Sequence, residues 1–257
     1  MNFQPVICFG QQPAGFFPKR FLVAKINTSR CLQKELGGKI VFFYHDSDAD
    51  YRETVTLMKD RQTGGEVRLN FTQENKLQKK FSPLYLKRIP QGWKEETLKQ
   101  LPRFVDQSLI DVFKSVNSDN AANFCLEMYK KLGLLEGIEV VRSGDKTFRQ
   151  QAGDLQEYFA DVEYQGEIVR AQLLDGKLQL HEGGGKYIVL PEQPIQKNQK
   201  TPGKDQRLGW MQSVINCTHY IYGEGEKDYL KFNDFPQIKF IQRDKIDNPD
   251  YAWIANN

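Results

Sequence analysis

The first 70 residues alternate short apolar runs with one stretch of helical spacing. Apolar residues dominate Gln4–Phe9 and fill most of Lys39–Tyr44. Between these runs, a Gly/Gln turn at Gly10–Gly15 is followed by helical spacing of apolar residues over Phe21–Leu32. Continuous apolar runs are typical of strands that are covered on both faces. The pattern therefore predicts a strand–helix–strand unit in a parallel sheet, with Glu66–Phe71 as a further strand candidate.

The middle of the chain changes from helical to alternating spacing. Apolar positions over about residues 93–135 predict a helical segment of two or more amphipathic helices, and Ile138–Arg142 is a short strand candidate. Over about residues 155–190 apolar and polar residues alternate, and Asp175-Gly176 separates two of the runs, which is typical of a β-hairpin. We therefore expect an antiparallel, β-rich extension of the parallel sheet.

The remaining third of the chain returns to a mixed pattern. Pro191–Gln206 is polar, basic and proline-containing, which favours a surface loop or a lid over a cleft. A helix is predicted over Arg207–Ile215 and a strand over Cys217–Tyr222. The pattern then predicts a short helix over Lys227–Phe232 and a last strand over Ile238–Ile241. We expect these elements to belong to a single α/β domain that spans the whole chain.

Composition limits the class of protein. The chain has 257 residues, of which 39% are hydrophobic, so it can bury a sizeable core. Its 36 Lys and Arg residues face 33 Asp and Glu residues, a balance that argues against nucleic acid as a partner. Its longest apolar run is far shorter than the ~20 residues of a membrane helix, so we expect no membrane partner. A homodimer is compatible with these properties.

The cysteines and the first residues indicate a compartment. Cys8, Cys31, Cys125 and Cys217 are widely separated and form no C-x-x-C pair, which argues against a disulfide scaffold. Residues 1–20 lack a basic leader followed by an apolar stretch. The sequence therefore predicts a cytoplasmic protein with reduced thiols.

Three polar segments follow predicted strands, at Gly10–Gly15, His45–Asp50 and Gly223–Lys227. Ligands of open α/β sheets bind outside the carboxyl ends of the strands, where loops and helix N-termini converge. We therefore expect these segments to meet at one site. The first segment has glycines that would let backbone N–H groups approach a phosphate or a carboxylate, but it lacks the established phosphate-loop spacings. A plain strand-to-helix turn is the alternative.

The second segment places three carboxylates and an imidazole within six residues. Such crowding is costly unless the groups are solvated, hydrogen-bonded or neutralised by a cation. Magnesium is the natural candidate, with Asp48 and Asp50 as its ligands. An acidic turn whose carboxylates cap a following helix explains the same residues equally well. In the third segment, Glu226 suits a substrate amine, a hydroxyl or a metal, and its alternative role is again that of a helix cap.

The order of these segments resembles the bacillithiol-biosynthesis cysteine-adding enzymes, a family of cysteine ligases. The family's Gly-Gln-Gln turn, small-residue pair and helical lysine are similar to Gly10-Gln11-Gln12, Ala14-Gly15 and Lys25. Its acidic segment is similar to Asp48-Ala49-Asp50-Tyr51-Arg52-Glu53. Its later motifs are similar to Thr201-Pro202, Arg207, Tyr220, Gly223, Gly225, Glu226, Tyr229 and Gln242-Arg243. The resemblance spans most of the chain.

The resemblance implies a Rossmann-like, doubly wound, mostly parallel sheet related to nucleotidyltransferases. It also implies a ligase or transferase that acts on a small anionic or sugar-like metabolite, with ATP or ADP and Mg²⁺ as candidate cofactors. Several features differ: Ala49 stands where the family has a histidine, with His45 displaced to the strand end, and Phe16-Phe17-Pro18-Lys19-Arg20 replaces the small-residue turn after Gly15. The chain is also shorter than members of that family. A non-catalytic module that retains the pocket for a metabolite or a partner is therefore the alternative.

The leading hypothesis gives each candidate residue a role. The catalytic candidates are His45, Asp48, Asp50 and Glu226, of which Asp48 and Asp50 would hold a metal or a substrate hydroxyl. Arg207 and Arg243 would clamp anionic oxygens, because a guanidinium binds them in a bidentate fashion. The other substrate- or nucleotide-binding candidates are Gly10, Gln11, Gln12, Gly15, Lys25, Tyr220, Gly223, Gly225 and Tyr229.

Overall fold

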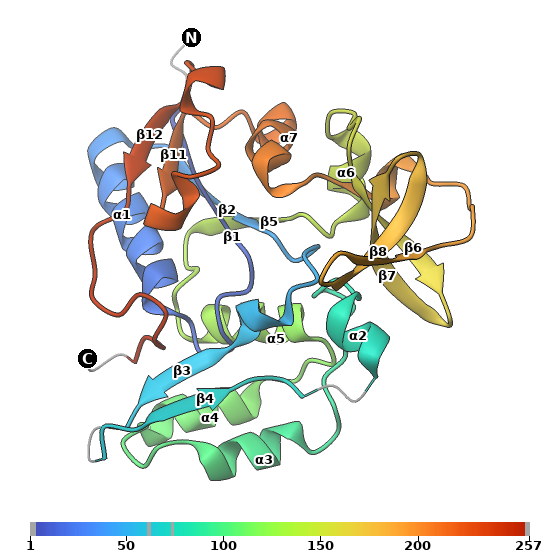
Figure 1. The fold of residues 1–257 in the computed structure, drawn as a ribbon. Coiled ribbons are helices and arrows are strands. Elements are labelled where there is room, and N and C mark those ends of the chain that lie inside the picture. The colour runs from blue at the N-terminus through green and yellow to red at the C-terminus, as the bar shows by residue number, and fades with distance from the viewer. Residues whose placement is uncertain (1–3, 61–62, 73–74, 255–257) are drawn as a thin grey trace.

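A central parallel sheet organises the protein, whose computed structural model describes residues 4–60, 63–72 and 75–254 (Figure 1). The strands of this sheet are β1 (Val6–Gln11), β2 (Lys39–Tyr44), β5 (Ile138–Arg142), β11 (His219–Tyr222) and β12 (Lys239–Gln242). They lie in the order β12-β11-β1-β2-β5, and every neighbouring pair is parallel. The chain thus winds from β1 towards β5 on one side and returns to β11 and β12 on the other. The direction of winding switches between β1 and β11.

Both faces of the parallel sheet are covered, because successive side chains of each strand point to opposite faces. Ile7 and Phe9 of β1 pack with α1 (Arg20–Leu36) and α5 (Ala121–Lys131). Cys8, between them, packs against α6 (Lys146–Gln151) and α7 (Arg207–Ile215) on the other face. All three residues are completely buried. The predicted double coverage of the sheet is therefore confirmed.

An aromatic cluster extends the core beyond the end of β1. Phe16 and Phe17 follow the turn after β1 and are both fully buried. The ring of Phe16 meets Trp93 edge-on at 5.1 Å between centroids and lies 5.7 Å from Phe113. This cluster packs between α3 (Trp93–Gln100), α4 (Gln107–Ser115) and a two-stranded sheet of β3 (Thr56–Lys59) and β4 (Glu66–Leu69). The turn after β1 is thereby anchored in the core.

The second sheet is antiparallel, as the alternating pattern predicts. Its strands are β6 (Phe159–Tyr164), β7 (Glu167–Leu174), β8 (Lys177–Gly183), β9 (Lys186–Val189) and β10 (Lys200–Thr201), in the order β10-β6-β7-β8-β9. Asp175 and Gly176 both have positive φ, which is the requirement of a type I′ hairpin turn. A short helix, α2 (Lys76–Lys80), and Phe81 cover the inner face of this sheet.

Most predicted elements are confirmed, and two segments differ from the prediction. Pro191–Gln206 is more than a loop, because Lys200 and Thr201 pair with β6 as β10. Lys227–Phe232 is not a helix: 3₁₀ turns at Glu224–Glu226 and Phe232–Asp234 flank it. The backbone N–H groups of Tyr229 and Leu230 donate to the backbone oxygen of Glu226, which forms a single turn that does not continue into a helix. In the described part of the chain, no helix has the length and apolar character needed to cross a membrane.

Candidate functional site

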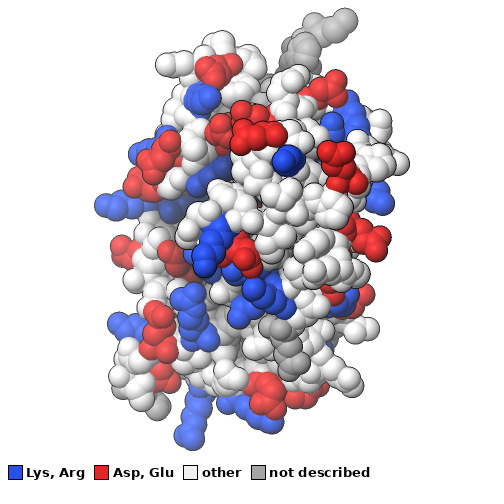
Figure 2. Space-filling model, turned by 45° about the vertical axis from the view of Figure 1, so that its right-hand side comes forward, with Lys and Arg blue, Asp and Glu red and all other residues white. Residues whose placement is uncertain are grey.

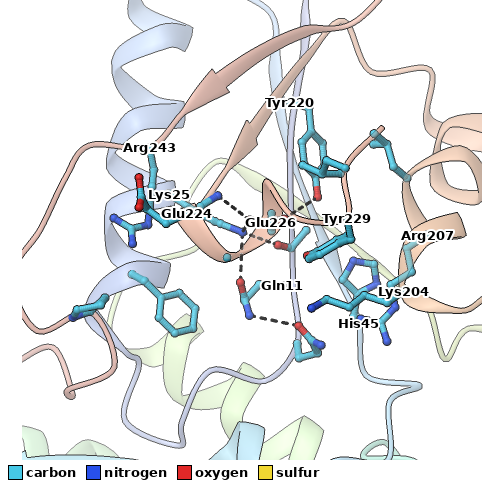
Figure 3. Close-up of a pocket in the computed structure, with 18 of the residues that line it drawn as sticks. Gln11, Lys25, His45, Lys204, Arg207, Tyr220, Glu224, Glu226, Tyr229 and Arg243 are labelled. Carbon is cyan, nitrogen blue, oxygen red and sulfur yellow. Dashed lines mark hydrogen bonds and ion pairs between the residues drawn. The ribbon is translucent and has the colours of Figure 1, made fainter. Parts of the chain in front are cut away.

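A cavity of about 350 Å³ opens where the parallel sheet switches direction (Figure 3). Its floor comes from the carboxyl ends of β1, β2, β11 and β12, and its walls come from α1 and from the start of α7. The predicted site residues that line it are Gly10, Gln11, Gln12, Lys25, His45, Arg207, Tyr220, Gly223, Gly225, Glu226, Tyr229 and Arg243. Residues that lie 233 positions apart in the sequence thus meet in one pocket.

A buried ion pair lies at the centre of the pocket. The Lys25 ammonium, on α1, contacts the Glu226 carboxylate, and the two side chains are 2% and 12% exposed. The same ammonium donates to the backbone oxygen of Gly10 at 2.9 Å and to Oε1 of Gln11 at 3.2 Å. Glu226 also accepts the backbone N–H of Gly223 at 2.6 Å. Lys25 is therefore fully engaged within the protein, and Glu226 fixes the turn after β11.

Gly10 is required by the side chains around it. A Cβ atom at Gly10 would lie 2.7 Å from the Tyr220 hydroxyl and 2.8 Å from Nε2 of His45, too close for any real side chain. Tyr220 in turn donates to Oε1 of Glu226 at 3.3 Å. The glycine thus lets a tyrosine and a histidine approach the end of β1. Its role is to admit these side chains.

His45 is held in its neutral form. It follows β2 directly, is 8% exposed and packs edge-on against Phe43 at 4.7 Å between ring centroids. Burial lowers the pKa of His45 well below its usual value, and the positive charge of Arg207 lowers it further. A neutral imidazole at the pocket wall can accept a proton from a bound ligand.

The buried state of His45 predicts a loss of stability in acid. As the pH falls below about 6.5, unfolded chains bind a proton at His45 while the folded protein does not, so the free energy of unfolding decreases. Between pH 7 and pH 5 we expect this histidine to account for about 1–2 kcal/mol. Urea unfolding of wild type and His45→Asn at both pH values measures the difference. The control is His181→Asn, a change at an exposed histidine. An equal decrease in the free energy of unfolding between pH 7 and pH 5 in wild type, His45→Asn and His181→Asn would contradict the prediction.

The carboxylates after β2 are each bound by a different arginine. Arg142 Nε donates to Asp46 at 2.6 Å, and Arg207 contacts Asp48 at 2.6 Å. Asp50 binds Arg52: its carboxylate accepts the backbone N–H of Arg52 and also the guanidinium, the latter at 2.6 Å. Although burial raises the pKa of Asp48, Arg207 and Arg170 together hold it below its usual range. The acidic segment is thus neutralised by cations of the protein itself.

The structure does not bring the predicted magnesium ligands into the pocket. Asp48 and Asp50 do not line the cavity, and their carboxylates bind Arg207 and Arg52 respectively. Asp50 caps the 3₁₀ turn Tyr51–Thr54, as the alternative interpretation of this segment predicts for a helix. In the ranges that the structure describes, no group of three or more His, Cys, Asp or Glu side chains could hold a metal ion.

Gly15 also lies outside the cavity. Its φ is +76°, and a Cβ atom there would approach the backbone oxygen of Phe17 to 2.5 Å. Its N–H donates to the backbone oxygen of Glu53 at 2.9 Å. Gly15 therefore shapes the turn after β1, and its N–H is not free to bind a phosphate as the sequence pattern suggested.

Some pocket residues were missed from the sequence. Glu53 lines the cavity, burial raises its pKa, and none of the described residues donates a hydrogen bond to its carboxyl group. Lys204 places its ammonium 4.1 Å from the centre of the Tyr229 ring, at the pocket wall. Asp250, near the end of the described chain, also lines the cavity. Glu53 closes the acidic segment, which was the available signal, whereas the basic segment Pro191–Gln206 suggested a loop or a lid but did not single out Lys204.

Arg243 provides the most direct sign of a ligand. It follows β12, is 9% exposed and lines the cavity. Its Nη1 donates to the backbone oxygen of Asp244 at 2.8 Å, but its buried Nε has no hydrogen-bond partner among the described residues. A buried donor without a partner is costly, so a ligand or an ordered water is expected to satisfy it. The fold and the pocket together define a mixed α/β protein with a polar, ligand-sized site at the switch in strand order.

Comparison with known proteins adds no family to this description. No protein-family model matches the chain, and none of the curated proteins gives a significant match.

Proposed function

We propose that the pocket is the active site of a ligase or transferase for a small anionic or sugar-like metabolite, on a Rossmann-like fold related to the cysteine-adding enzymes. The observation that carries the proposal is the convergence of motif residues from four strand ends on one cavity. The strand order β12-β11-β1-β2-β5 is also the order of a doubly wound sheet, in which ligands bind at the switch point. Both support the expected relationship.

The side chains suggest how a ligand is held. The guanidinium of Arg243 and the ammonium of Lys204 are available for a carboxylate or a phosphate, whereas Lys25 is committed to Glu226. Neutral His45 can take a proton from an attacking amine, hydroxyl or thiol. The raised pKa of Glu53 places a second proton carrier in the same cavity. Cations and acid–base groups thus line one cavity of metabolite size.

The same residues fit a nucleotide with Mg²⁺ poorly. Gly15 has no free N–H, Lys25 is paired within the protein, and Asp48 is bound by Arg207. The remaining cations suit one anionic group better than a triphosphate. We therefore derive no catalytic step from ATP or Mg²⁺ and treat nucleotides only as ligands to be tested.

Isothermal titration tests the proposal. Wild-type protein is titrated with cysteine, malate, a glucosaminyl malate, ATP and ADP, the nucleotides with and without Mg²⁺, and mixtures are analysed for condensation products by mass spectrometry. A bound carboxylate or phosphate ligand should lose about tenfold or more in affinity in Arg243→Gln, because one charge-assisted contact is removed. Arg52→Gln, which removes an exposed arginine outside the cavity, should bind normally. Binding that is equal in both variants would contradict the proposed site.

One observation favours the non-catalytic alternative. Ala49 replaces the family's histidine, and the neighbouring Asp48 is occupied by Arg207. A metabolite-binding or partner-binding module would bind a ligand of the titration series without forming any product. Nucleotide binding that is lost in Asp48→Asn, together with product formation, would exclude this alternative.

A further inference from the structure

Residues 198–207 join the antiparallel sheet to α7 and bring Lys204 and Arg207 to the pocket. The first part of this segment is fixed to the antiparallel sheet. Its β10 strand pairs with β6, and Gln199 Nε2 donates to the backbone oxygen of Asp161 at 2.9 Å. Lys204 and Arg207 form the cationic wall of the pocket. This wall is therefore attached to a sheet that itself contributes no side chain to the cavity.

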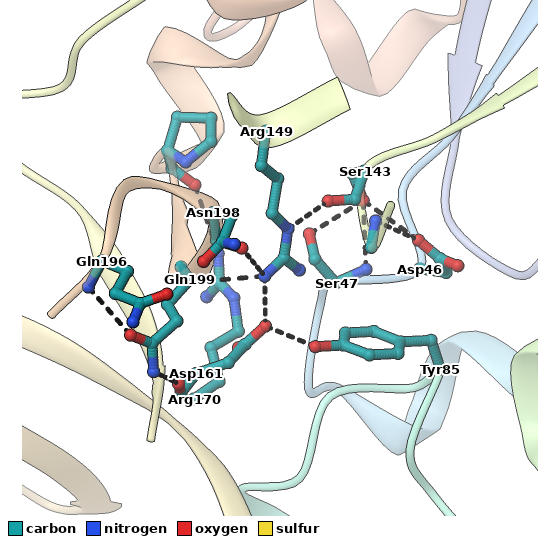
Figure 4. A network of polar contacts seen from close by, with 12 residues as sticks. Asp46, Ser47, Tyr85, Ser143, Arg149, Asp161, Arg170, Gln196, Asn198 and Gln199 are labelled. Carbon is teal, nitrogen blue, oxygen red and sulfur yellow. Dashed lines mark hydrogen bonds and ion pairs between the residues drawn. The ribbon is translucent and has the colours of Figure 1, made fainter. Parts of the chain in front are cut away.

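Arg170 of β7 holds the next part of the segment (Figure 4). Its Nη2 donates to the backbone oxygen of Pro202 at 3.2 Å, two residues before Lys204. Its guanidinium lies over the ring of Phe159 with 3.7 Å between Cζ and the ring centre. The planar group is thus locked between one aromatic ring and one backbone carbonyl, an arrangement that lysine cannot reproduce.

The charge of Arg170 also reaches the pocket wall. Burial lowers the pKa of Arg170 to about 10, and the negative charge of Asp48 opposes that shift. Asp48 in turn binds Arg207 at 2.6 Å. The Asp48 carboxylate is thus influenced by two guanidinium groups: Arg207 contacts it directly, and Arg170 acts on it from the antiparallel sheet. Both positive charges favour the ionised form of Asp48.

We propose that Arg170 is a positioning residue for the pocket: it fixes the backbone before Lys204, so that Lys204 and Arg207 keep their places at the pocket, and its positive charge stabilises the Asp48 carboxylate that binds Arg207. The proposal rests on the proposed function, because it assigns a task to the cations of that site. The antiparallel sheet then belongs to the binding machinery as the frame of its cationic wall.

Hydrogen exchange tests the first part of this proposal. In Arg170→Gln we expect the amides of residues 203–208 to exchange about tenfold faster than in wild type, while α1 and the parallel sheet keep their protection. Arg88→Gln is the matched control, because Arg88 binds Glu167 at the start of the same strand but contacts no part of residues 198–207. Unchanged exchange of this segment in Arg170→Gln would overturn the proposal.

Titration of the Asp48 carboxyl group, followed by NMR of labelled aspartate, tests the second part. The pKa of Asp48 should rise in Arg170→Gln and stay unchanged in Arg88→Gln, a difference that a merely structural role of Arg170 would not produce. Neither readout needs a ligand, so a failure of the proposed function leaves both measurements valid. Conversely, a metabolite that binds Arg170→Gln as tightly as wild type would overturn the positioning role while leaving the site intact.

Arg170→Lys covers the case in which Arg170→Gln does not fold. Lysine retains the charge but loses the planar stack on Phe159 and the directed bond to Pro202. We expect faster exchange of residues 203–208 together with a nearly wild-type titration of Asp48. Wild-type exchange in this variant would overturn the anchoring role.

Discussion

Replacing Lys25 by methionine should lower the free energy of unfolding by about 3–5 kcal/mol, because the variant leaves a nearly buried carboxylate without its cation. Glu226 is 12% exposed and, among the residues that the structure describes, would keep only the Gly223 N–H and the Tyr220 hydroxyl as partners. The variant also removes the ammonium that joins α1 to the end of β1 at Gly10. Urea unfolding at pH 7 measures the loss.

Two further variants isolate the buried pair. Lys39→Met removes the partner of Glu139 from a pair whose side chains are both more than half exposed, so it should cost less than about 1 kcal/mol. In Lys25→Met with Glu226→Gln the uncompensated charge is gone, and we expect part of the stability to return. A Lys25→Met loss no larger than that of Lys39→Met would show that the pair is hydrated.

The strands of the parallel sheet and α1 could be predicted because each has a local pattern of apolar residues that is typical of its structure. Lys39–Tyr44 is apolar on both faces, and the structure buries Val41 and Phe43 on one face and Ile40 and Phe42 on the other. The helical spacing before it likewise matches α1. Glycine and polar residues after strands indicated the site, because strand ends of a parallel sheet meet at one edge.

The partners of charged residues could not be predicted, because they are brought together only by the tertiary fold. Arg207 lies 159 positions from Asp48, and no local pattern connects them. The sequence therefore suggested a metal where the structure provides arginines. On the face of the molecule drawn in Figure 2, basic and acidic side chains are interspersed instead of gathered by sign. Such a face offers no continuous basic track for a nucleic acid.

Two short strands were not predicted from the sequence, for a different reason. β3 and β10 have four and two residues, and the sequence analysis assigned no strand to either segment. Their positions follow from pairing with β4 and β6, which a local pattern does not contain. Lys204 was missed for the same reason, since its place at the pocket depends on where β10 ends.

Replacing Arg149 by methionine should be as damaging as the change at Lys25, with an expected loss of about 3–5 kcal/mol. Arg149 on α6 and Asp161 on β6 are 1% and 4% exposed and lie 2.6 Å apart. Arg149 Nε also donates to the backbone oxygen of Ser143 at 2.7 Å, which joins the end of β5 to the antiparallel sheet. Without the guanidinium, the Asp161 carboxylate would retain only the Tyr85 hydroxyl, at 2.7 Å, among the residues that the structure describes (Figure 4).

The control pair for this prediction lies on the surface of the same region. Lys197 contacts Asp154 at 3.1 Å, and the Asp154 side chain is 84% exposed, so Lys197→Met should cost less than about 1 kcal/mol. Combining Arg149→Met with Asp161→Leu replaces both charges by apolar groups and should recover part of the loss in urea unfolding. If the double variant loses the sum of the two single losses, the two charges do not stabilise each other. The junction between the sheets would then depend on the individual backbone contacts of Arg149.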